Sequence, residues 1–299
     1  MPSPGADDIR DYRRAGKVAK DAIILARDAT KEGTLAIDVA KKVEKFIGDS
    51  GASIAFPINI CLNHVAAHYT PSDRDQLRFA KGDVVKLDIG VHINGCIADT
   101  ATTVEVATSN WTSLIKSSED ALDCALEMLA PGVGTSSIGS AIDTAIQSRG
   151  FNSVKNLTGH SMERNVLHAG ITVPNFASGE RSILKSGTVV AIEPFATDGK
   201  GSVGGNKSGN IYHVIGNRTL SDEDANSFLA SLIEKFDHLP FANRWCVGLS
   251  KDFDSFIKKH WRHGNIRSYP ILAERVGTMV SQAEHSALIL DDEVIVYTR

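Results

Sequence analysis

The fold is decided by residues 82–103, Gly-Asp-Val-Val-Lys-Leu-Asp-Ile-Gly-Val-His-Ile-Asn-Gly-Cys-Ile-Ala-Asp-Thr-Ala-Thr-Thr. Two runs rich in Val, Ile, Leu and Thr flank Asn94-Gly95. An Asn-Gly pair between such runs predicts a β-hairpin with a two-residue turn, because both turn residues need a positive φ. With that turn, Gly90 lies opposite Asp99.

Two acids then share one face of the hairpin. Side chains alternate between faces along a strand, so Asp88 lies on the face of Gly90 and becomes a diagonal neighbour of Asp99, roughly 7–8 Å away at the backbone. Cys96 points to the other face, and His92 lies about 13 Å from Asp88 along the strand. Neither is expected to join the two acids.

Paired acids on an apolar hairpin have two explanations. Burying unpaired carboxylates is costly, and like charges close together raise one pKa sharply, so a divalent cation would resolve the conflict. Alternatively, this face of the hairpin is solvated and the acids keep it soluble. The hairpin alone leaves both readings open.

Composition bounds the class of protein. With 299 residues, 42% hydrophobic and 23% charged, the chain can bury a large core. A net charge of −4 argues against a nucleic-acid partner. The start of the chain lacks an apolar signal segment, and no apolar run reaches the roughly 18 residues of a membrane span, so we expect a soluble cytoplasmic protein. Four scattered cysteines are expected to be reduced core residues: Cys61, Cys96, Cys124 and Cys246.

Helical patterns precede the hairpin. Apolar residues recur at three- and four-residue spacings over 7–29 and 36–49, which predicts two amphipathic helices. Gly51 stands where a left-handed C-cap is expected. Residues 54–60 then read as a strand broken by Pro57.

The second half of the chain repeats the first. Residues 81–88 align with 185–193 when one residue is skipped, so that Asp88 falls on Glu193. The economical interpretation is an internal duplication, helices followed by strands, with a pseudo-twofold axis and a site between the halves.

The repeat is interrupted after Glu193. A glycine-rich stretch at 199–210 leads into helical patterns, and strand-like sequence resumes at 277–290. Residues 205–272 are therefore predicted to be a helical insertion subdomain within one catalytic domain that spans 1–299. Glu284 then becomes the counterpart of Asp99.

A joint pattern emerges from these positions. A lone loop histidine is more often a surface residue than a ligand, and Glu193 by itself could simply end a strand. Yet both halves offer acids at equivalent positions, and His160 lies in a Gly-flanked loop between them. Carboxylates and imidazole without thiolate suit a pair of divalent ions such as Mn, Fe, Co or Zn better than a structural zinc, and hydrolysis is their natural chemistry.

Several motifs resemble one enzyme family. They are Asn63-x-x-Ala-Ala-His68-Tyr-Thr-Pro, Leu87-Asp-Ile-Gly90 with Ala98-Asp-Thr-Ala101, Gly159-His160 with Leu167-His-Ala-Gly170, Ala191-Ile-Glu-Pro-Phe-Ala-Thr197 and Gln282-Ala-Glu-His285. Together they resemble type II methionine aminopeptidases in their short archaeal form, over nearly the whole chain and including the insertion.

The resemblance implies a mixed α/β (α+β) pita-bread fold and removal of the initiator methionine from nascent chains whose second residue is small. It implies two divalent ions that activate a water or hydroxide: Asp88 holds one, His160 and Glu193 hold the other, and Asp99 and Glu284 bridge both.

The resemblance also implies roles for residues beside the metals. Glu193 moves the proton, and His68 and His168 contact the substrate and stabilise the tetrahedral intermediate. Phe56, Leu167, Phe195 and Tyr269 wall the methionine pocket. We expect a monomer that acts on nascent polypeptide N-termini and needs neither nucleic acid nor membrane.

Two alternatives stay open. A proline-directed peptidase (prolidase) of the same fold would use the same five ligands, although such relatives usually carry an extra N-terminal domain. A non-catalytic relative that associates with ribosomes or RNA would be expected to lose ligands and gain basic surface.

Overall fold

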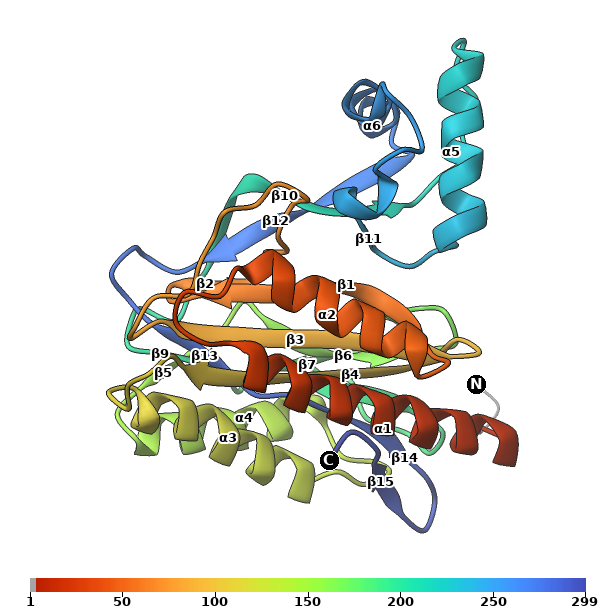
Figure 1. Cartoon of the computed structure of the whole chain (residues 1–299). Coiled ribbons are helices and arrows are strands. Elements are labelled where there is room, and N and C mark those ends of the chain that lie inside the picture. The colour runs from red at the N-terminus through yellow and green to blue at the C-terminus, as the bar shows by residue number, and fades with distance from the viewer. Residues whose placement is uncertain (1–3) are drawn as a thin grey trace.

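The computed structural model describes residues 4–299, apart from the side chain of Asn206 (Figure 1). The expected domain starts at residue 1, and its first three residues lie outside this range. The helices are α1 (Ala6–Ala29), α2 (Ala36–Asp49), α3 (Thr112–Glu127), α4 (Thr135–Ser148), α5 (Glu223–Phe236), the 3-10 helix η1 (Asn243–Cys246) and α6 (Phe253–Arg262). The strands are β1 (Ser53–Leu62), β2 (Val65–Ala67), β3 (Val84–Ile93), β4 (Cys96–Glu105), β5 (Asn152–Ser153), β6 (Thr158–Met162), β7 (Thr172–Pro174), β8 (Val189–Ile192), β9 (Phe195–Thr197), β10 (Gly204–Val214), β11 (Phe241–Ala242), β12 (Ile266–Ala273), β13 (Val280–Gln282), β14 (His285–Ile289) and β15 (Val294–Val296).

The central hairpin has the predicted register. β3 and β4 pair antiparallel with Gly90 opposite Asp99, and Asn94 and Gly95 both have positive φ values, 51° and 83°. β1 pairs along the other edge of β3, in the order β1-β3-β4. β1 is not broken at Pro57. It runs through that residue and absorbs it in a register shift.

The first half places helices on one face of this sheet. α1 and α2 lie across the strands in Figure 1, and the buried residues Leu87, Ile89 and Val91 of β3 belong to the same apolar core as α1 and α2. Because side chains alternate along a strand, Asp88 and Gly90 point to the opposite face.

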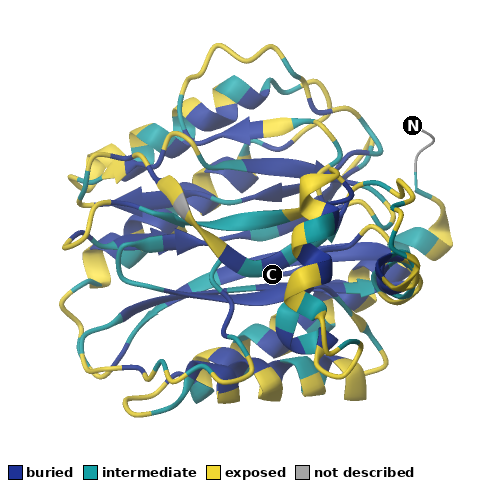
Figure 2. Cartoon of the chain, turned by 90° about the horizontal axis from the view of Figure 1, so that it is seen from above, coloured by how far each residue is buried: buried dark blue, intermediate teal, exposed yellow. Residues whose placement is uncertain are grey.

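The second half follows the same plan. α3 and α4 share an apolar core with β7, β8 and β14, which belong to a sheet of order β15-β14-β8-β6-β7. Figure 2 shows the buried strands between helices whose outer faces are exposed. The order of helices followed by strands therefore occurs twice, as the repeat predicts.

The two halves meet at β4 and β14. The backbones of Ala101 and Glu284 form an isolated antiparallel bridge. Ser286 Oγ accepts from the amide of Asp99 at 2.9 Å and donates to the Asp99 carbonyl at 2.7 Å. The strand that carries Asp99 and the strand that follows Glu284 are thus joined directly.

The repeat is approximate at this junction. In the second half Ile192 lies opposite His285, so one further residue in the same register brings Glu193 opposite Glu284. In the first half Asp88 lies opposite Ala101, two residues beyond Asp99. The two acid pairs occupy related but not identical register positions.

The segment expected to be a helical insertion is helical only between residues 223 and 262. It begins and ends in β10 and β12, which pair with each other in a sheet of order β11-β10-β12-β2. The glycine-rich stretch turns around Glu274, whose carboxylate accepts from the amides of Gly201 and Ser202 at 3.0 Å each.

One side chain ties the insertion to the first half. Arg244 donates to Thr70 Oγ1 at 2.7 Å and to the Pro71 carbonyl at 2.9 Å, and its guanidinium also pairs with Glu44 of α2. The Arg244 side chain is buried, so the insertion is anchored rather than loosely attached.

The cysteine prediction is wrong at one position. Cys61, Cys96 and Cys246 are buried, whereas Cys124 lies on the exposed face of α3. In the described part of the chain, no helix combines the length and apolar character needed to cross a membrane.

We predict that Gly16→Ala destabilises the fold. A Cβ at Gly16 in α1 would lie 1.9 Å from the backbone oxygen of Tyr297, and backbone cannot move aside like a side chain. We expect a loss of about 1–3 kcal/mol or more in the free energy of unfolding, measured by urea denaturation.

Gly48→Ala is the matched control, because a Cβ at Gly48 in α2 meets nothing within 4 Å. This variant should be as stable as the parent or gain roughly 0.5–1 kcal/mol. Equal midpoints for the parent and Gly16→Ala would contradict the close approach of α1 to Tyr297.

Candidate metal centre

A cavity of about 330 Å³ opens between the two halves, within the size range of ligand pockets. It is lined by all five predicted metal ligands, by both predicted substrate-contacting histidines and by three of the four predicted wall residues. The full lining is Phe56, Asn59, Ala67, His68, Asp88, Asp99, Asn156, Leu157, Thr158, His160, Leu167, His168, Gly170, Ile171, Thr172, Glu193, Ile211, Pro240, Tyr269 and Glu284.

The five predicted ligands come from five different segments. Asp88 lies on β3, Asp99 on β4 and His160 on β6, while Glu193 directly follows β8 and Glu284 directly precedes β14. They are brought together by tertiary structure alone, because each half contributes strands that converge at the cavity.

Their side chains lie close enough to share a cation. His160 Nε2 is 3.5 Å from Asp99 Oδ2 and 3.9 Å from Glu193 Oε1. One ligand atom from each of Asp99, His160 and Glu284 lies within 4.8 Å of the other two, and these three residues are buried. Gln282 Nε2 donates to Glu284 Oε2 at 3.2 Å and holds that carboxylate in place.

Electrostatics oppose ionisation of this cluster. Burial and the neighbouring carboxylates raise the pKa values of Asp88, Glu193 and Glu284 well above their usual range. Burial also raises the pKa of Asp99 to about 7. For His160, burial lowers the pKa to about 4, so its imidazole is neutral at pH 7.

The arrangement fits a divalent cation. Asp88 Oδ1 and Asp99 Oδ1 are buried and have no hydrogen-bond partner among the described residues. Unpaired carboxylate oxygens beside a neutral imidazole are the donors that Mn, Fe, Co or Zn accepts. Lys86 does not supply the missing charge, because its ammonium donates to the carbonyls of Asn63 and Val84.

The hydrogen bond made by His68 limits the role expected of it. Its Nδ1 lies 3.1 Å from the Pro270 carbonyl oxygen, which can only accept, so Nδ1 carries the proton. Burial lowers its pKa to about 4. Neutral His68 therefore has a lone pair on Nε2, and it accepts a hydrogen bond instead of donating one to a developing negative charge.

His168 lies at the exposed rim of the cavity beside the metal ligands. Its ring centroid is 4.5 Å from that of His160. Desolvation by the surrounding protein is the main cause that lowers the pKa of His168, and the neighbouring His160 lowers it further. The imidazole of His168 is therefore also neutral at pH 7. A neutral imidazole keeps one N–H, which leaves His168 as the histidine able to donate to a substrate.

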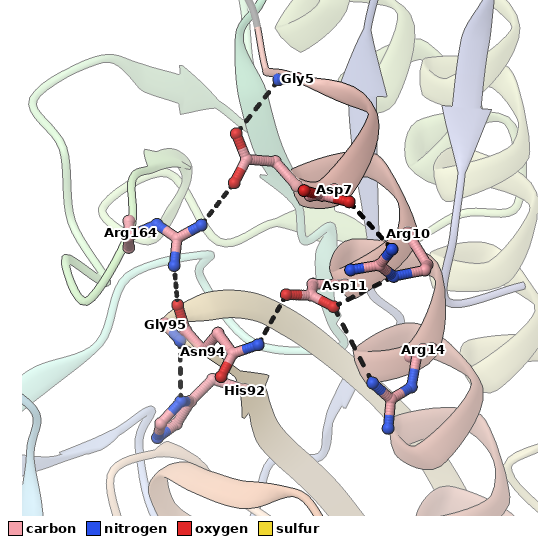
Figure 3. A network of polar contacts seen from close by, with 10 residues as sticks. Gly5, Asp7, Arg10, Asp11, Arg14, His92, Asn94, Gly95 and Arg164 are labelled. Carbon is pink, nitrogen blue, oxygen red and sulfur yellow. Dashed lines mark hydrogen bonds and ion pairs between the residues drawn. The ribbon is translucent and has the colours of Figure 1, made fainter.

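The loop that carries Leu167 and His168 is fixed by the hairpin turn. Arg164 donates to the Asn94 carbonyl and pairs with Asp8 of α1, and the amide of Asn165 donates to the Gly95 carbonyl at 3.0 Å. Figure 3 shows Arg164 reaching the turn, with Asn94 held from the other side by Asp11.

The apolar wall differs from the prediction at one residue. Phe56, Leu167 and Tyr269 line the cavity, but Phe195 is fully buried in a separate core with Val154 and other apolar residues. The ring of Phe56 has room in the cavity wall because residue 90 is a glycine. A Cβ at Gly90 would lie 2.2 Å from that ring.

Other lining residues were missed from the sequence, among them Asn59, Thr158, Ile171, Ile211 and Pro240. They belong to no motif with an assigned chemistry. Only Asn59 could have been noticed in the sequence, because it is a polar residue within an otherwise apolar strand.

Comparison with known proteins places these observations in a family. The model of metallopeptidase family M24 matches residues 10–215. The chain is similar to a protein named methionine aminopeptidase from Archaeoglobus fulgidus, with 41% identity over 294 residues that cover 98% of this chain and 99% of that protein.

Solved structures share the fold. A thermophilic Arx1 has a TM-score of 0.87 at 15% identity, covering 99% of this chain and 91% of its own. Methionine aminopeptidase from Thermotoga maritima has a TM-score of 0.72 at 20% identity, covering 100% and 99%. The expected mixed α/β pita-bread fold is thereby confirmed.

We predict that a divalent cation stabilises the protein more as the pH rises. The metal-free carboxyl groups hold protons up to near neutral pH, with the pKa of Asp99 at about 7, and a cation must displace those protons. The increase in Tm caused by Mn²⁺ should therefore be larger at pH 8 than at pH 6. Groups that titrate equally in the metal-loaded and the metal-free protein do not contribute to the difference in Tm between the two forms.

Proton release gives an independent measurement. Calorimetric titration of Mn²⁺ in buffers of different ionisation enthalpy should detect protons released at pH 6.5 and fewer at pH 8. In Asp99→Asn, which removes the titrating group at the centre of the cluster, the Tm response should become small at every pH. A Mn²⁺ response that shrinks as the pH rises would contradict the assignment.

Proposed function

The chain belongs to metallopeptidase family M24, and from this premise we propose that it is an aminopeptidase that removes the N-terminal methionine from polypeptides. The observation that carries the proposal is a single cavity in which Asp88, Asp99, His160, Glu193 and Glu284 lie beside an apolar wall. Similarity to methionine aminopeptidases over nearly the whole chain supports it.

We propose that the centre takes two divalent ions, which would be held by Asp88, Asp99, His160, Glu193 and Glu284. The proximity of Asp99 to His160 and Glu284 and the unpaired oxygens of Asp88 and Asp99 support this assignment of cation ligands. When bound, such ions activate water and polarise a carbonyl group.

Glu193 is the candidate for moving the proton. Its carboxylate directly follows β8 and lines the cavity, and in the metal-free site burial and the charges of Asp99 and Asp88 raise its pKa well above the usual range. In the proposed reaction Glu193 takes a proton from the attacking water and delivers it to the leaving amine of the second residue.

The two histidines take different parts. His168 donates to the scissile carbonyl oxygen, where negative charge develops in the transition state. His68, with Nδ1 committed to Pro270, accepts from the N–H of the second residue. Both serve as neutral imidazoles.

Phe56, Leu167 and Tyr269 receive the methionine side chain. An apolar wall discriminates by fit, and a missing methylene costs only roughly 1–3 kcal/mol, so related apolar side chains should be cleaved slowly rather than excluded. The preference for a small second residue rests on the resemblance to the type II family.

The setting of the reaction is also part of the proposal. The enzyme acts as a monomer in the cytoplasm on the N-termini of nascent chains, where newly made methionine termini occur. It needs neither nucleic acid nor membrane, in keeping with its net charge of −4. All five ligands are present, which disfavours a non-catalytic role.

We predict metal-dependent release of methionine from Met-Ala-Ser. The metal-stripped protein should be inactive, and Mn²⁺, Fe²⁺, Co²⁺ or Zn²⁺, added in turn, should restore release measured by chromatography. Met-Lys should be a poor substrate because its second residue is large. Cleavage of Ala-Pro in place of Met-Ala-Ser would favour the proline-directed alternative. Absence of hydrolysis with every metal would refute the enzyme assignment.

Two variants separate the metal-binding and substrate-contacting roles. Asp99→Ala should abolish turnover and reduce bound metal, measured by atomic emission, because Asp99 lies at the centre of the cluster. His168→Ala should keep its metal and lower kcat by about 10²–10³-fold. The control is His238→Ala, whose side chain is 71% exposed and outside the cavity, and it should match the parent. Loss of metal in His168→Ala would contradict its assignment.

A further inference from the structure

Glu193 is held by its sheet less completely than its counterpart in the first half. Asp88 lies within the ten-residue strand β3 and is paired on both sides, with Asn59 of β1 and Ala101 of β4. Glu193 lies beyond the last residue of β8, and the chain passes there into β9, which belongs to another sheet. Pro194 follows and has no N–H to donate to a neighbouring strand. Regular strand pairing therefore ends just before Glu193.

A side chain from the edge of the sheet contacts Glu193 at this point. Asn175 directly follows β7, the edge strand, and is fully buried. Its amide nitrogen donates to the Glu193 carbonyl at 3.2 Å and to the Leu157 carbonyl at 3.1 Å. Leu157 directly precedes β6, which lies between β7 and β8, and both Leu157 and Glu193 line the cavity. One amide group thus joins the ends of three strands beside the cavity.

Only the nitrogen of this amide can make both contacts. Its two partners are carbonyl oxygens, which only accept, and the NH₂ group of asparagine has two hydrogens to donate. The amide oxygen of Asn175 is buried and has no hydrogen-bond partner between residues 4 and 299. The side chain therefore acts as a double donor, and an ionised aspartate of the same shape could donate to neither carbonyl.

The backbone on both sides of Asn175 lies against a helix. A Cβ at Gly139 in α4 would lie 2.6 Å from the carbonyl oxygen of Pro174 and 2.3 Å from that of Phe176. This close approach is possible because residue 139 is a glycine, and it leaves the segment little room to move. Asn175 is thus a fixed point to which Glu193 is attached, rather than a side chain that follows Glu193.

We infer that Asn175 is a positioning residue for the metal centre, because its amide group holds the backbone of Glu193 and thereby directs the Glu193 carboxylate toward the other cation ligands. The inference rests on the proposed function, in which Glu193 binds a cation and moves the proton. Glu193 Oε1 lies 3.9 Å from His160 Nε2, and a shift of the backbone at residue 193 would change that spacing. Asn175 itself contacts neither cation nor substrate.

The test measures Mn²⁺ affinity by calorimetry in the parent and in Asn175→Leu, which keeps a similar side-chain volume and removes both donors. The affinity should fall by about 10-fold, the lower end of the range for groups that orient a metal ligand, because Asn175 acts on the backbone of Glu193 and not on its carboxylate. The visible absorption of the Co²⁺-loaded protein should also change, because it reports how the ligands are arranged. Neither measurement needs turnover.

The control is Asn265→Leu. Asn265 is also fully buried and its amide nitrogen donates to the Arg218 carbonyl at 2.8 Å, but it lies outside the cavity lining. This variant should lose stability, measured by urea denaturation, and keep the Mn²⁺ affinity and the Co²⁺ absorption of the parent. Asn175→Ala takes the place of Asn175→Leu in both measurements if the latter does not show a cooperative melt.

Parent values of either the Mn²⁺ affinity or the Co²⁺ absorption in Asn175→Leu would overturn the inference. An equal loss of affinity in Asn265→Leu would overturn it as well, because affinity would then follow stability and not the position of Glu193. The parent might instead bind Mn²⁺ without hydrolysing Met-Ala-Ser, while Asn175→Leu alone loses affinity. That result would count against the proposed function and leave the positioning role of Asn175 standing.

Discussion

Repulsion among four buried carboxylates is the constraint on which this structure depends. Asp88, Asp99, Glu193 and Glu284 converge on one cavity, and burial there raises their pKa values. Such a cluster opposes folding unless cations or protons compensate it. The fold must therefore hold these acids together mechanically and leave room for positive charge between them.

The double architecture supplies that mechanical hold. Each half buries the helix-facing side of its sheet, so the other side is free to carry polar groups toward the middle. The bridge between Ala101 and Glu284 and the two hydrogen bonds of Ser286 to the Asp99 backbone then join the halves beside the acids. The hairpin turn extends this support to the rim, because Asn94 and Gly95 also hold the loop of His168.

The sequence predicted features that depend on local chemistry. The Asn-Gly turn determines the register of β3 and β4, and the shared face of Asp88 and Asp99 follows from alternation alone. Features that depend on contacts between distant parts of the chain could not be predicted from the sequence. Phe195 matches a wall position by motif, but its side chain packs into a neighbouring core. The donor state of His68 depends on Pro270, 202 residues away in the chain. The strands β10 and β12 are extended because they pair with each other, which no local pattern in a glycine-rich stretch could indicate.

Charge balance in the cavity depends on what binds there. At pH 7 the imidazoles of His68, His160 and His168 are neutral, and Lys86 Nζ, whose pKa burial lowers to about 7, donates to backbone carbonyls. Positive charge in the cavity must then arrive with ions or substrate. Two divalent ions would neutralise the four carboxylates once these are ionised.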